Sequence, residues 1–188
     1  MPKDGFALMH IILAAGGSTR MGRPKALLGV GDGRPAIVAW VDRLAPHGPV
    51  TVVTGAVHAP IAELVGGRAR LVHNERWAET GPLESLVLAL EPGWDRCLVT
   101  PVDAPLPSPE AIAALVDAAA PAALGHDGRP GHPVVLDAPT LERIRTLSDF
   151  EGGLRRHLPP LAVIEAGPRT LLNLNTPAAW AAAYGSTS

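Results

Sequence analysis

The residues best suited to chemistry are concentrated in one short segment, LAAGGSTRMGRPKALL, which covers positions 13–28. Gly16, Gly17 and Gly22 let backbone N–H groups approach a ligand closely. The hydroxyl and basic side chains of this segment add hydrogen-bond donors and positive charge, and they belong to Ser18, Thr19, Arg20, Arg23 and Lys25. A polyphosphate suits this combination, although a glycine-rich turn that binds nothing is the alternative interpretation.

Two familiar phosphate-binding motifs are absent from this segment. The spacing G-x-G-x-x-G is not met, because Gly17 is followed by Ser18 and Thr19. The motif G-K-[ST] is not met either, because Lys25 stands between Pro24 and Ala26. The sequence therefore disfavours a nicotinamide-dependent oxidoreductase and a P-loop ATPase.

A candidate metal ligand, Asp103, follows the apolar run from Cys97 to Pro101. An unpaired carboxylate is costly at the end of a buried strand, and a bound cation would offset that cost. Capping of the next helix is the alternative role, but Ser108 is better placed for it. The position of Ser108 thus weakens the capping role and leaves a bound metal ion at Asp103 as the functional interpretation.

Two asparagines near the C-terminus form a second polar pair. In the run LLNLN, residues 171–175, the alternation predicts a strand that places Asn173 and Asn175 on the same side. Thr176 and Pro177 then provide a cap and a first turn for the last helix.

The elements that must position these residues follow an alternating pattern. Short apolar runs alternate with Ala- and Leu-rich stretches, which predicts a layered α/β domain with a mostly parallel sheet. Ligands of such sheets bind beyond the carboxyl ends of the strands, so Thr54, Asn74 and the loop after Leu13 should face one crevice. The expected strands are 7–13, 50–54, 69–72, 97–101, 122–125, 134–136, 161–165 and 171–175, and the expected helices are 35–44, 59–65, 82–90, 110–120, 140–147, 153–158 and 177–184.

Length and composition narrow the class of protein. The length of the chain predicts one domain over residues 1–188. The net charge of −2 argues against binding to nucleic acid, which usually needs an excess of basic residues. Cys97, the single cysteine, is expected to be a core residue. The first apolar run is too short to span a membrane and no convincing cleavage site follows it, so a cytoplasmic location without membrane contact is expected.

The segment from Leu13 to Lys25 resembles the signature of the MobA-like nucleotidyltransferases, the molybdenum-cofactor guanylyl- and cytidylyltransferase group. That signature reads L-A-[AG]-G-x-S-x-R-M-G-x-x-K, and every fixed position is met. Asn74 and the motifs GPL (81–83), VDAP (102–105), HDGxxxHP (126–133) and NLNTP (173–177) follow in the family's order. The resemblance covers nearly the whole chain. It implies a three-layer α/β/α Rossmann-like nucleotidyltransferase fold with a mixed, mostly parallel central sheet.

The resemblance also implies the activity and the site. Such an enzyme uses Mg²⁺ to transfer a nucleoside monophosphate from a triphosphate to a phosphorylated small molecule, and it releases pyrophosphate. Arg20, Lys25 and Asp103 are the implied catalytic residues, and Asp103 and Asn175 the implied metal ligands. The implied acceptor side contains His132 and Asn173. The implied nucleotide-binding residues are Leu13, Ala14, Ala15, Gly16, Gly17, Lys25, Thr54, Asn74, Gly81, Pro82, Leu83 and Ser85.

Several points stay open at this stage. The loop signature is similar to the cytidylyltransferase branch, whereas the GPL and NLNTP segments are similar to the guanylyltransferase branch. Both polar positions of NLNTP are asparagine, and residues 149–153 lack the Gly-Asp of relatives. A nucleotide-binding accessory module, or a transferase that uses a sugar phosphate, is therefore the alternative to a molybdopterin transferase.

Smaller expectations complete the sequence-based description. Arg155 and Arg156 are consistent with an anion-binding pair or with a solvated helix face. Trp77 is expected to pack in the core rather than line the cleft. The chain is expected to be a monomer or a weak dimer, with a cofactor-receiving enzyme as a partner.

Overall fold

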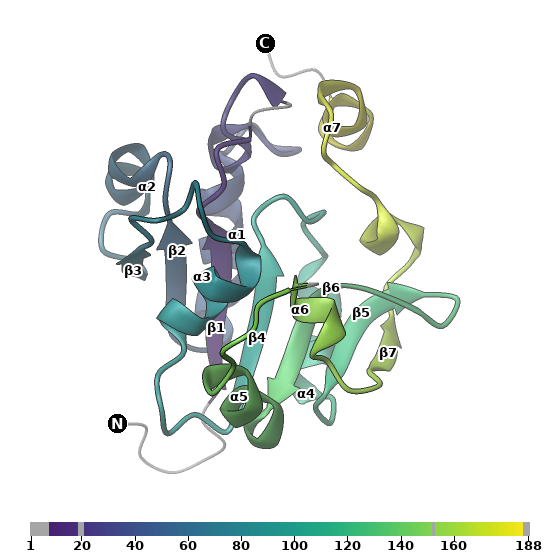
Figure 1. The fold of residues 1–188 in the computed structure, drawn as a ribbon. Coiled ribbons are helices and arrows are strands. Elements are labelled where there is room, and N and C mark those ends of the chain that lie inside the picture. The colour runs from purple at the N-terminus through teal and green to yellow at the C-terminus, as the bar shows by residue number, and fades with distance from the viewer. Residues whose placement is uncertain (1–7, 19–20, 152, 186–188) are drawn as a thin grey trace.

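The computed structural model describes residues 8–18, 21–151 and 153–185. Within them one seven-stranded sheet has the order β3-β2-β1-β4-β6-β5-β7 (Figure 1). β1 pairs in parallel with β2 and β4, whereas β6 runs antiparallel to β4 and β5. The sheet is therefore mixed and mostly parallel, as predicted. Its strands are β1 (Leu8–Ala14), β2 (Val50–Thr54), β3 (Arg70–His73), β4 (Arg96–Pro101), β5 (Ala122–His126), β6 (Arg129–Asp137) and β7 (Ala162–Glu165).

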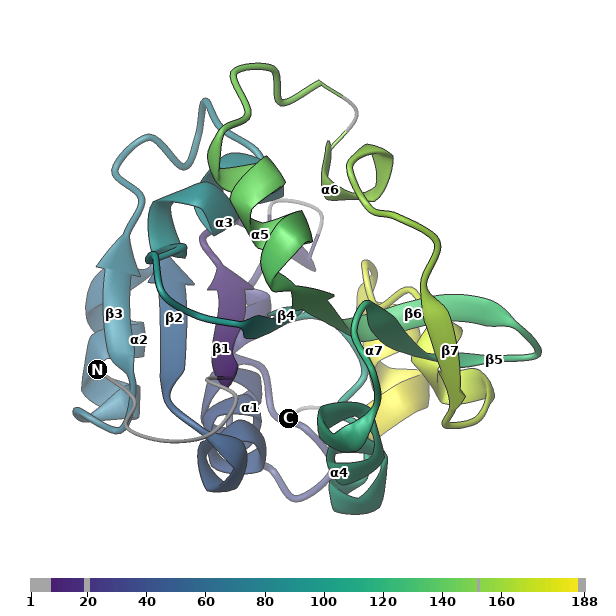
Figure 2. The same cartoon turned by 90° about the horizontal axis from the view of Figure 1, so that it is seen from below.

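Helices cover both faces of this sheet and complete three layers (Figures 1 and 2). α1, α2, α4 and α7 contribute to the apolar core on one face, and α3, α5 and α6 pack on the other. The helices are α1 (Ala36–Leu44), α2 (His58–Val65), α3 (Pro82–Ala89), α4 (Pro109–Asp117), α5 (Ala138–Arg145), α6 (Gly153–Arg156) and α7 (Pro177–Tyr184). Short 3-10 turns occur at η2 (Lys25–Leu27), η3 (Ala45–His47) and η4 (Pro168–Leu171). Among the residues described, no helix has the length and apolar character needed to cross a membrane.

The strand expected at residues 171–175 is not formed, and this prediction was wrong. Pro168 begins the 3-10 turn η4, and residues 172–175 form no strand with any residue that the structure describes. The backbone N–H of Asn175 donates to Oδ1 of Asn173 at 3.1 Å, so the asparagine side chain folds onto its own backbone. The alternation of Leu and Asn therefore reflects a local turn instead of two faces of a strand.

The predicted core and cap residues hold their expected places. Cys97 is fully buried, and burial raises the pKa of its thiol well above the ordinary value. Ser108 caps α4 by accepting from the backbone N–H of Ala111 at 3.2 Å, so Asp103 is free of that role. Thr176 caps α7 in the same way, accepting from Ala179 at 3.2 Å.

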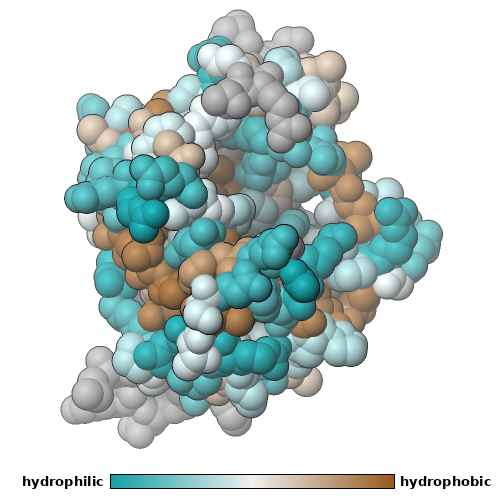
Figure 3. Space-filling view, viewed as in Figure 1, coloured by the Kyte–Doolittle hydropathy of each residue, from teal (hydrophilic) through white to brown (hydrophobic). Residues whose placement is uncertain are grey.

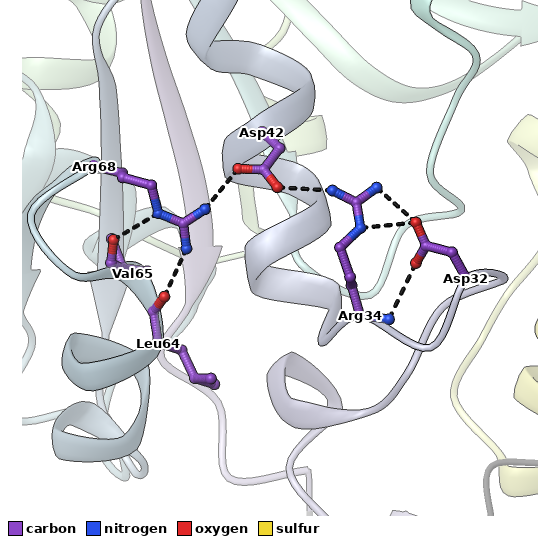
Figure 4. Close-up of polar contacts among 6 residues, drawn as sticks. All are labelled: Asp32, Arg34, Asp42, Leu64, Val65 and Arg68. Atoms are coloured by element: carbon purple, nitrogen blue, oxygen red, sulfur yellow. Dashed lines mark hydrogen bonds and ion pairs between the residues drawn. The ribbon is translucent and has the colours of Figure 1, made fainter.

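A surface ion-pair network fixes the loop that leads into α1. Asp42 on α1 accepts from Arg34 and from Arg68, each at 2.7 Å (Figure 4). Arg34 also pairs with Asp32 at 2.7 Å, within the loop itself. Each exposed pair contributes only about 0–1 kcal/mol. The Arg34 pairs link the loop to α1, and the Arg68 pair links the segment after α2 to the same carboxylate.

Candidate functional site

A cavity of about 370 Å³ opens at the carboxyl ends of β1 and β4. These two strands are neighbours, with Leu13 opposite Pro101, and the backbone N–H of Val102 donates to the carbonyl of Leu13 at 3.0 Å. The glycine-rich loop and the segment around Asp103 therefore begin side by side. The cavity is lined by Leu13, Ala14, Ala15, Gly16, Ser18, Met21, Pro24, Lys25, Ala26, Trp77, Thr80, Gly81, Pro82, Ser85, Pro101, Val102, Asp103 and Asn175.

Helix α7 brings the last segment of the chain to the same place. The indole N–H of Trp180 donates to the carbonyl of Gly29 at 2.9 Å, which ties α7 to the loop before α1. The hydroxyl of Tyr184 accepts from the backbone N–H of Leu106 at 2.7 Å, which ties α7 to the segment after β4. Asn175 stands just before α7, so these two contacts hold it at the cavity.

Lys25, Asp103 and Asn175 meet at one end of the cavity. The Lys25 ammonium donates to Oδ2 of Asp103 at 2.6 Å and also to Oδ1 of Asn175. The backbone N–H of Lys25 donates to Oγ of Ser18 at 3.1 Å, which fixes the start of η2. The side chains of Lys25 and Asp103 are 11% and 28% exposed, so the ion pair is largely shielded from water. Residues far apart in the sequence thus place two oxygens around one positive charge.

This donor set fits a divalent cation of the Mg²⁺ type. Asp103 offers a carboxylate oxygen and Asn175 an amide oxygen, which are the ligand types that Mg²⁺ accepts. Both oxygens already contact the same ammonium group, so they are close enough to share one cation. Mg²⁺ usually takes few protein ligands and fills its other positions with water and phosphate oxygens.

Most of the residues predicted to bind nucleotide line the cavity, and a minority lie behind it. Thr54 is fully buried, and its hydroxyl contacts Nδ1 of His58 at 2.7 Å. Asn74 donates to Oγ of Ser85 at 3.1 Å and so supports the cavity wall from inside. Leu83 is 1% exposed and belongs to the core under α3. Gly17 does not line the cavity, and Arg20 and Thr19 lie outside the described residues.

Trp77 packs against the apolar core beneath α3, as expected, and it also lines the cavity. Two glycines make room for its ring. A Cβ on Gly17 would lie 3.0 Å from the indole, and a Cβ on Gly55 would lie 2.6 Å from Cβ of Trp77 and 2.4 Å from the carbonyl of Ala15. The signal that could have identified Trp77 is its position between Asn74 and Gly81, in a loop already assigned to the site.

A second cavity of about 440 Å³ lies beside the first and shares Asp103 and Asn175 with it. His132 and Asn173, the residues predicted on the acceptor side, both line this second cavity. Burial lowers the pKa of His132, and the positive charge of Arg155 acts in the same direction, against the opposing effect of Asp103. His132 is therefore neutral at neutral pH.

Another group of potential ligands lies at the end of the β5–β6 hairpin. The ligand atoms of His126, Asp127 and Glu165 all lie within 4.8 Å of one another. Nδ1 of His126 and Oε1 of Glu165 are 2.6 Å apart, and this hydrogen bond raises the pKa of His126. None of these residues lines the two cavities, so the group is separate from the Asp103 site.

A known protein family matches most of the chain. The family model described as the MobA-like NTP transferase domain matches residues 10–164. No curated protein matches the chain at a significant level.

Solved structures share the fold at low sequence identity. Rv0371c from Mycobacterium tuberculosis H37Rv is 19% identical, with a TM-score of 0.79 over 98% of this chain and 100% of its own. Its complex with manganese is 17% identical, with a TM-score of 0.65 over 86% and 89% of the two chains. The CTP:phosphocholine cytidylyltransferase of Streptococcus pneumoniae is 20% identical, with a TM-score of 0.67 over 92% and 96%.

Proposed function

The chain belongs to the MobA-like NTP transferase domain family, and we propose that it transfers a nucleoside monophosphate from CTP or GTP to a phosphorylated small molecule. The observation that carries this proposal is the convergence of Lys25, Asp103 and Asn175 at one end of a cavity beside a glycine-rich loop. Molybdopterin is the acceptor to test first, because the loop signature resembles that of the molybdenum-cofactor enzymes.

The residues of the first cavity divide into two groups by chemistry. Trp77, Gly81 and Pro82 offer an indole ring and a tight backbone turn, which suit a flat nucleobase. The segment from Gly16 to Lys25 offers backbone N–H groups and positive charge, which suit the phosphates. We therefore place the base near Trp77 and the triphosphate along the glycine-rich loop, with the α-phosphorus facing Asp103.

The reaction needs little covalent chemistry from the protein. An oxygen of the acceptor phosphate forms a bond to the α-phosphorus while the bond from that phosphorus to the bridging oxygen breaks, and pyrophosphate leaves with the electron pair. The Lys25 ammonium reduces the repulsion between the anionic reactants and the charge on the leaving group. Mg²⁺, when held by Asp103 and Asn175, would add further positive charge at the phosphates. Positioning and electrostatic stabilisation then supply the catalysis.

Lys25 also has a role before the nucleotide binds. Its ammonium group neutralises Asp103 in a largely shielded site, where an unpaired carboxylate would be costly. With a divalent ion held by Asp103 and Asn175, the Lys25 ammonium would be available to pair with the phosphates instead.

Calorimetric titration with CTP, GTP, UTP and ATP in the presence of Mg²⁺ tests the proposal. We expect either CTP or GTP to bind at least about tenfold more tightly than the others, and Lys25→Ala to weaken that binding by a similar factor. Arg70→Ala is the matched control, because Arg70 is an exposed cation paired with Glu91 at 2.6 Å. If none of the four binds the wild type at millimolar concentration, the proposal is wrong.

The alternative is an accessory module that binds nucleotide without turnover, and the identity of residue 175 supports it. Asn175 supplies an amide, whereas the D-x-D-T-P version of the family motif would supply a carboxylate, so less negative charge is available to a metal ion. Pyrophosphate release in the presence of molybdopterin separates the two functions. Tight nucleotide binding without release of pyrophosphate, whether molybdopterin or a sugar phosphate is supplied, would favour the accessory module.

A further inference from the structure

A third cavity, of about 500 Å³, lies on the face of the sheet that α3 and α6 cover. Residues of β1, β4 and β6 line it on the side of the sheet, and residues of α6 and of the segment that follows α6 line it on the outer side. Figure 1 shows α6 in front of the sheet, near β6. In the space-filling view of the same face, apolar surface shows in the area where α3 and α6 lie (Figure 3). The aliphatic side chains that line the cavity are Leu13, Val99, Val134, Leu154, Leu158 and Leu161.

This apolar cavity is continuous with the candidate active site. It shares Leu13, Pro82 and Pro101 with the first cavity, and it shares Pro101, His132 and Arg155 with the second. All three cavities therefore meet at Pro101, the last residue of β4, two positions before Asp103. A ligand that reaches the reacting atoms from the second cavity has the apolar cavity directly beside it.

The polar side chains of the apolar cavity, His132 and Arg155, lie where this cavity meets the second cavity. Nδ1 of His132 is buried and has no hydrogen-bond partner in the described part of the chain. Arg155 is exposed, and its guanidinium forms no ion pair with any residue that the structure describes. The cavity thus has a free cation at its mouth and aliphatic walls beyond it.

We propose that the phosphorylated acceptor carries an apolar body, which lies between β6 and α6 against Val134, Leu154 and Leu158, with its phosphate near Arg155. This inference rests on the proposed function and names the class of acceptor. A polyol body, as in a sugar phosphate, would bury hydroxyl groups against side chains that offer no partner, at a cost of roughly 1–3 kcal/mol for each. An aromatic or aliphatic body gains instead by burying apolar surface.

Binding of two phosphate monoesters of equal charge tests the inference on the full chain, without nucleotide. 1-Naphthyl phosphate has an apolar body that fits a cavity of about 500 Å³, and glycerol 3-phosphate has a polyol body. We expect the wild type to bind 1-naphthyl phosphate at least about tenfold more tightly by calorimetry. Equal affinity for the two compounds would contradict the inference.

Variants locate the preference in the cavity. Leu158→Glu places a carboxylate in the wall, and Leu158→Trp fills the space without charge, so each should abolish the preference for 1-naphthyl phosphate. Leu88→Glu is the matched control, because Leu88 is 54% exposed and lines none of the three cavities. Arg155→Ala should weaken both compounds by a similar factor. A preference that survives both Leu158 variants, with their unfolding temperatures unchanged, would overturn the inference.

Nucleotide titration of the same samples separates this inference from the proposed function. Leu158→Glu should bind nucleotide as the wild type does, because Leu158 does not line the first cavity. If the wild type binds nucleotide but shows no preference for 1-naphthyl phosphate, only the inference about the acceptor is wrong. If the wild type binds no nucleotide but still prefers 1-naphthyl phosphate, and the Leu158 variants lose that preference, the proposed function is wrong. The cavity is then a binding site for phosphate esters with an apolar body.

Discussion

Lys25 is the residue on which the account of the site depends most. It contacts a carboxylate and an amide from two distant segments, and its own backbone is fixed by Ser18. An ammonium group is a compact charge that three acceptors can surround, whereas a guanidinium is planar and larger. We therefore regard Lys25 as a centre of positive charge that arginine could not replace at the same distances.

Trp77 gives a prediction at the same scale. If its indole ring forms the wall beside the nucleobase, Trp77→Leu should weaken nucleotide binding by about tenfold, since stacking of a base on an aromatic ring contributes about 1–3 kcal/mol. Titration calorimetry with the preferred triphosphate measures this loss. Trp94→Leu is the control, because Trp94 packs against the core under α3 and does not line the cavity. Unchanged affinity in Trp77→Leu would remove the base from this wall.

At the scale of elements, the hydrophobic pattern predicts strands and helices better than it predicts irregular segments. β2 was expected at 50–54 and is observed there, and α3 ends one residue earlier than expected. β6 begins at Arg129, five residues before the expected start at residue 134. The prediction placed the start too late because Pro130, Gly131 and Pro133 have the composition of a turn. Such residues are tolerated here because the strand begins in a hairpin, where fewer ladder bonds are lost.

The site itself was predictable only in part, for a physical reason. A glycine-rich loop, or an aspartate at the end of a strand, can be recognised from the few residues around it in the sequence. The contact of Trp77 with Gly55, and the apolar cavity between β6 and α6, depend on packing between distant segments. The run at 171–175 misled the prediction, because the Asn173 side chain competes with the sheet for a backbone N–H.

Gly55 provides a test at the scale of elements. A Cβ there would lie 2.4 Å from the carbonyl of Ala15 and 2.6 Å from Cβ of Trp77, so the ends of β1 and β2 and the Trp77 loop would have to separate. Gly55→Ala should lower the free energy of unfolding by about 1–3 kcal/mol and weaken nucleotide binding. Urea denaturation measures the first effect. Gly31→Ala is the matched control, because a Cβ at Gly31 meets nothing within 4 Å. Equal stability of the two variants would contradict the packing described.

In the molecule as a whole, one face of the sheet is covered by a filled apolar core and the other face contains a cavity. The core beneath α1, α2, α4 and α7 holds the scaffold together, and α7 also carries Asn175 to the site. The opposite face, beneath α3 and α6, is incompletely filled and contains the apolar cavity. The net charge of −2 does not reveal the positive charge at the site, because Lys25 and Arg155 act locally.

Stability should depend on pH through His10. This residue of β1 is fully buried, and burial lowers its pKa to about 4. The unfolded chain takes up a proton below about pH 6.5 while the native state does not, so stability is complete above that pH and is lost as the pH falls toward 4. The loss attributable to His10 between pH 7.5 and pH 5 should be about 2 kcal/mol.

Urea denaturation at these two pH values, in the wild type and in His10→Leu, measures this contribution. The difference in stability between the two pH values should be smaller in the variant. The partly exposed His126 cannot explain the effect, because its hydrogen bond to Glu165 raises its pKa and it therefore adds stability as the pH falls. An equal pH dependence in both proteins would show that His10 is not the responsible group.

The dependence of nucleotide binding on Mg²⁺, compared between the wild type and Asp103→Ala, shows whether a metal ion binds at Asp103. In the wild type, Mg²⁺ should tighten binding of the preferred triphosphate by at least about tenfold, or about 1.4 kcal/mol. Asp103→Ala should lose this enhancement, whereas Glu91→Ala, an exposed carboxylate on the surface, should retain it. If Asp103→Ala binds the triphosphate with the same Mg²⁺ enhancement as the wild type, the metal does not bind at Asp103 and the proposed site is wrong.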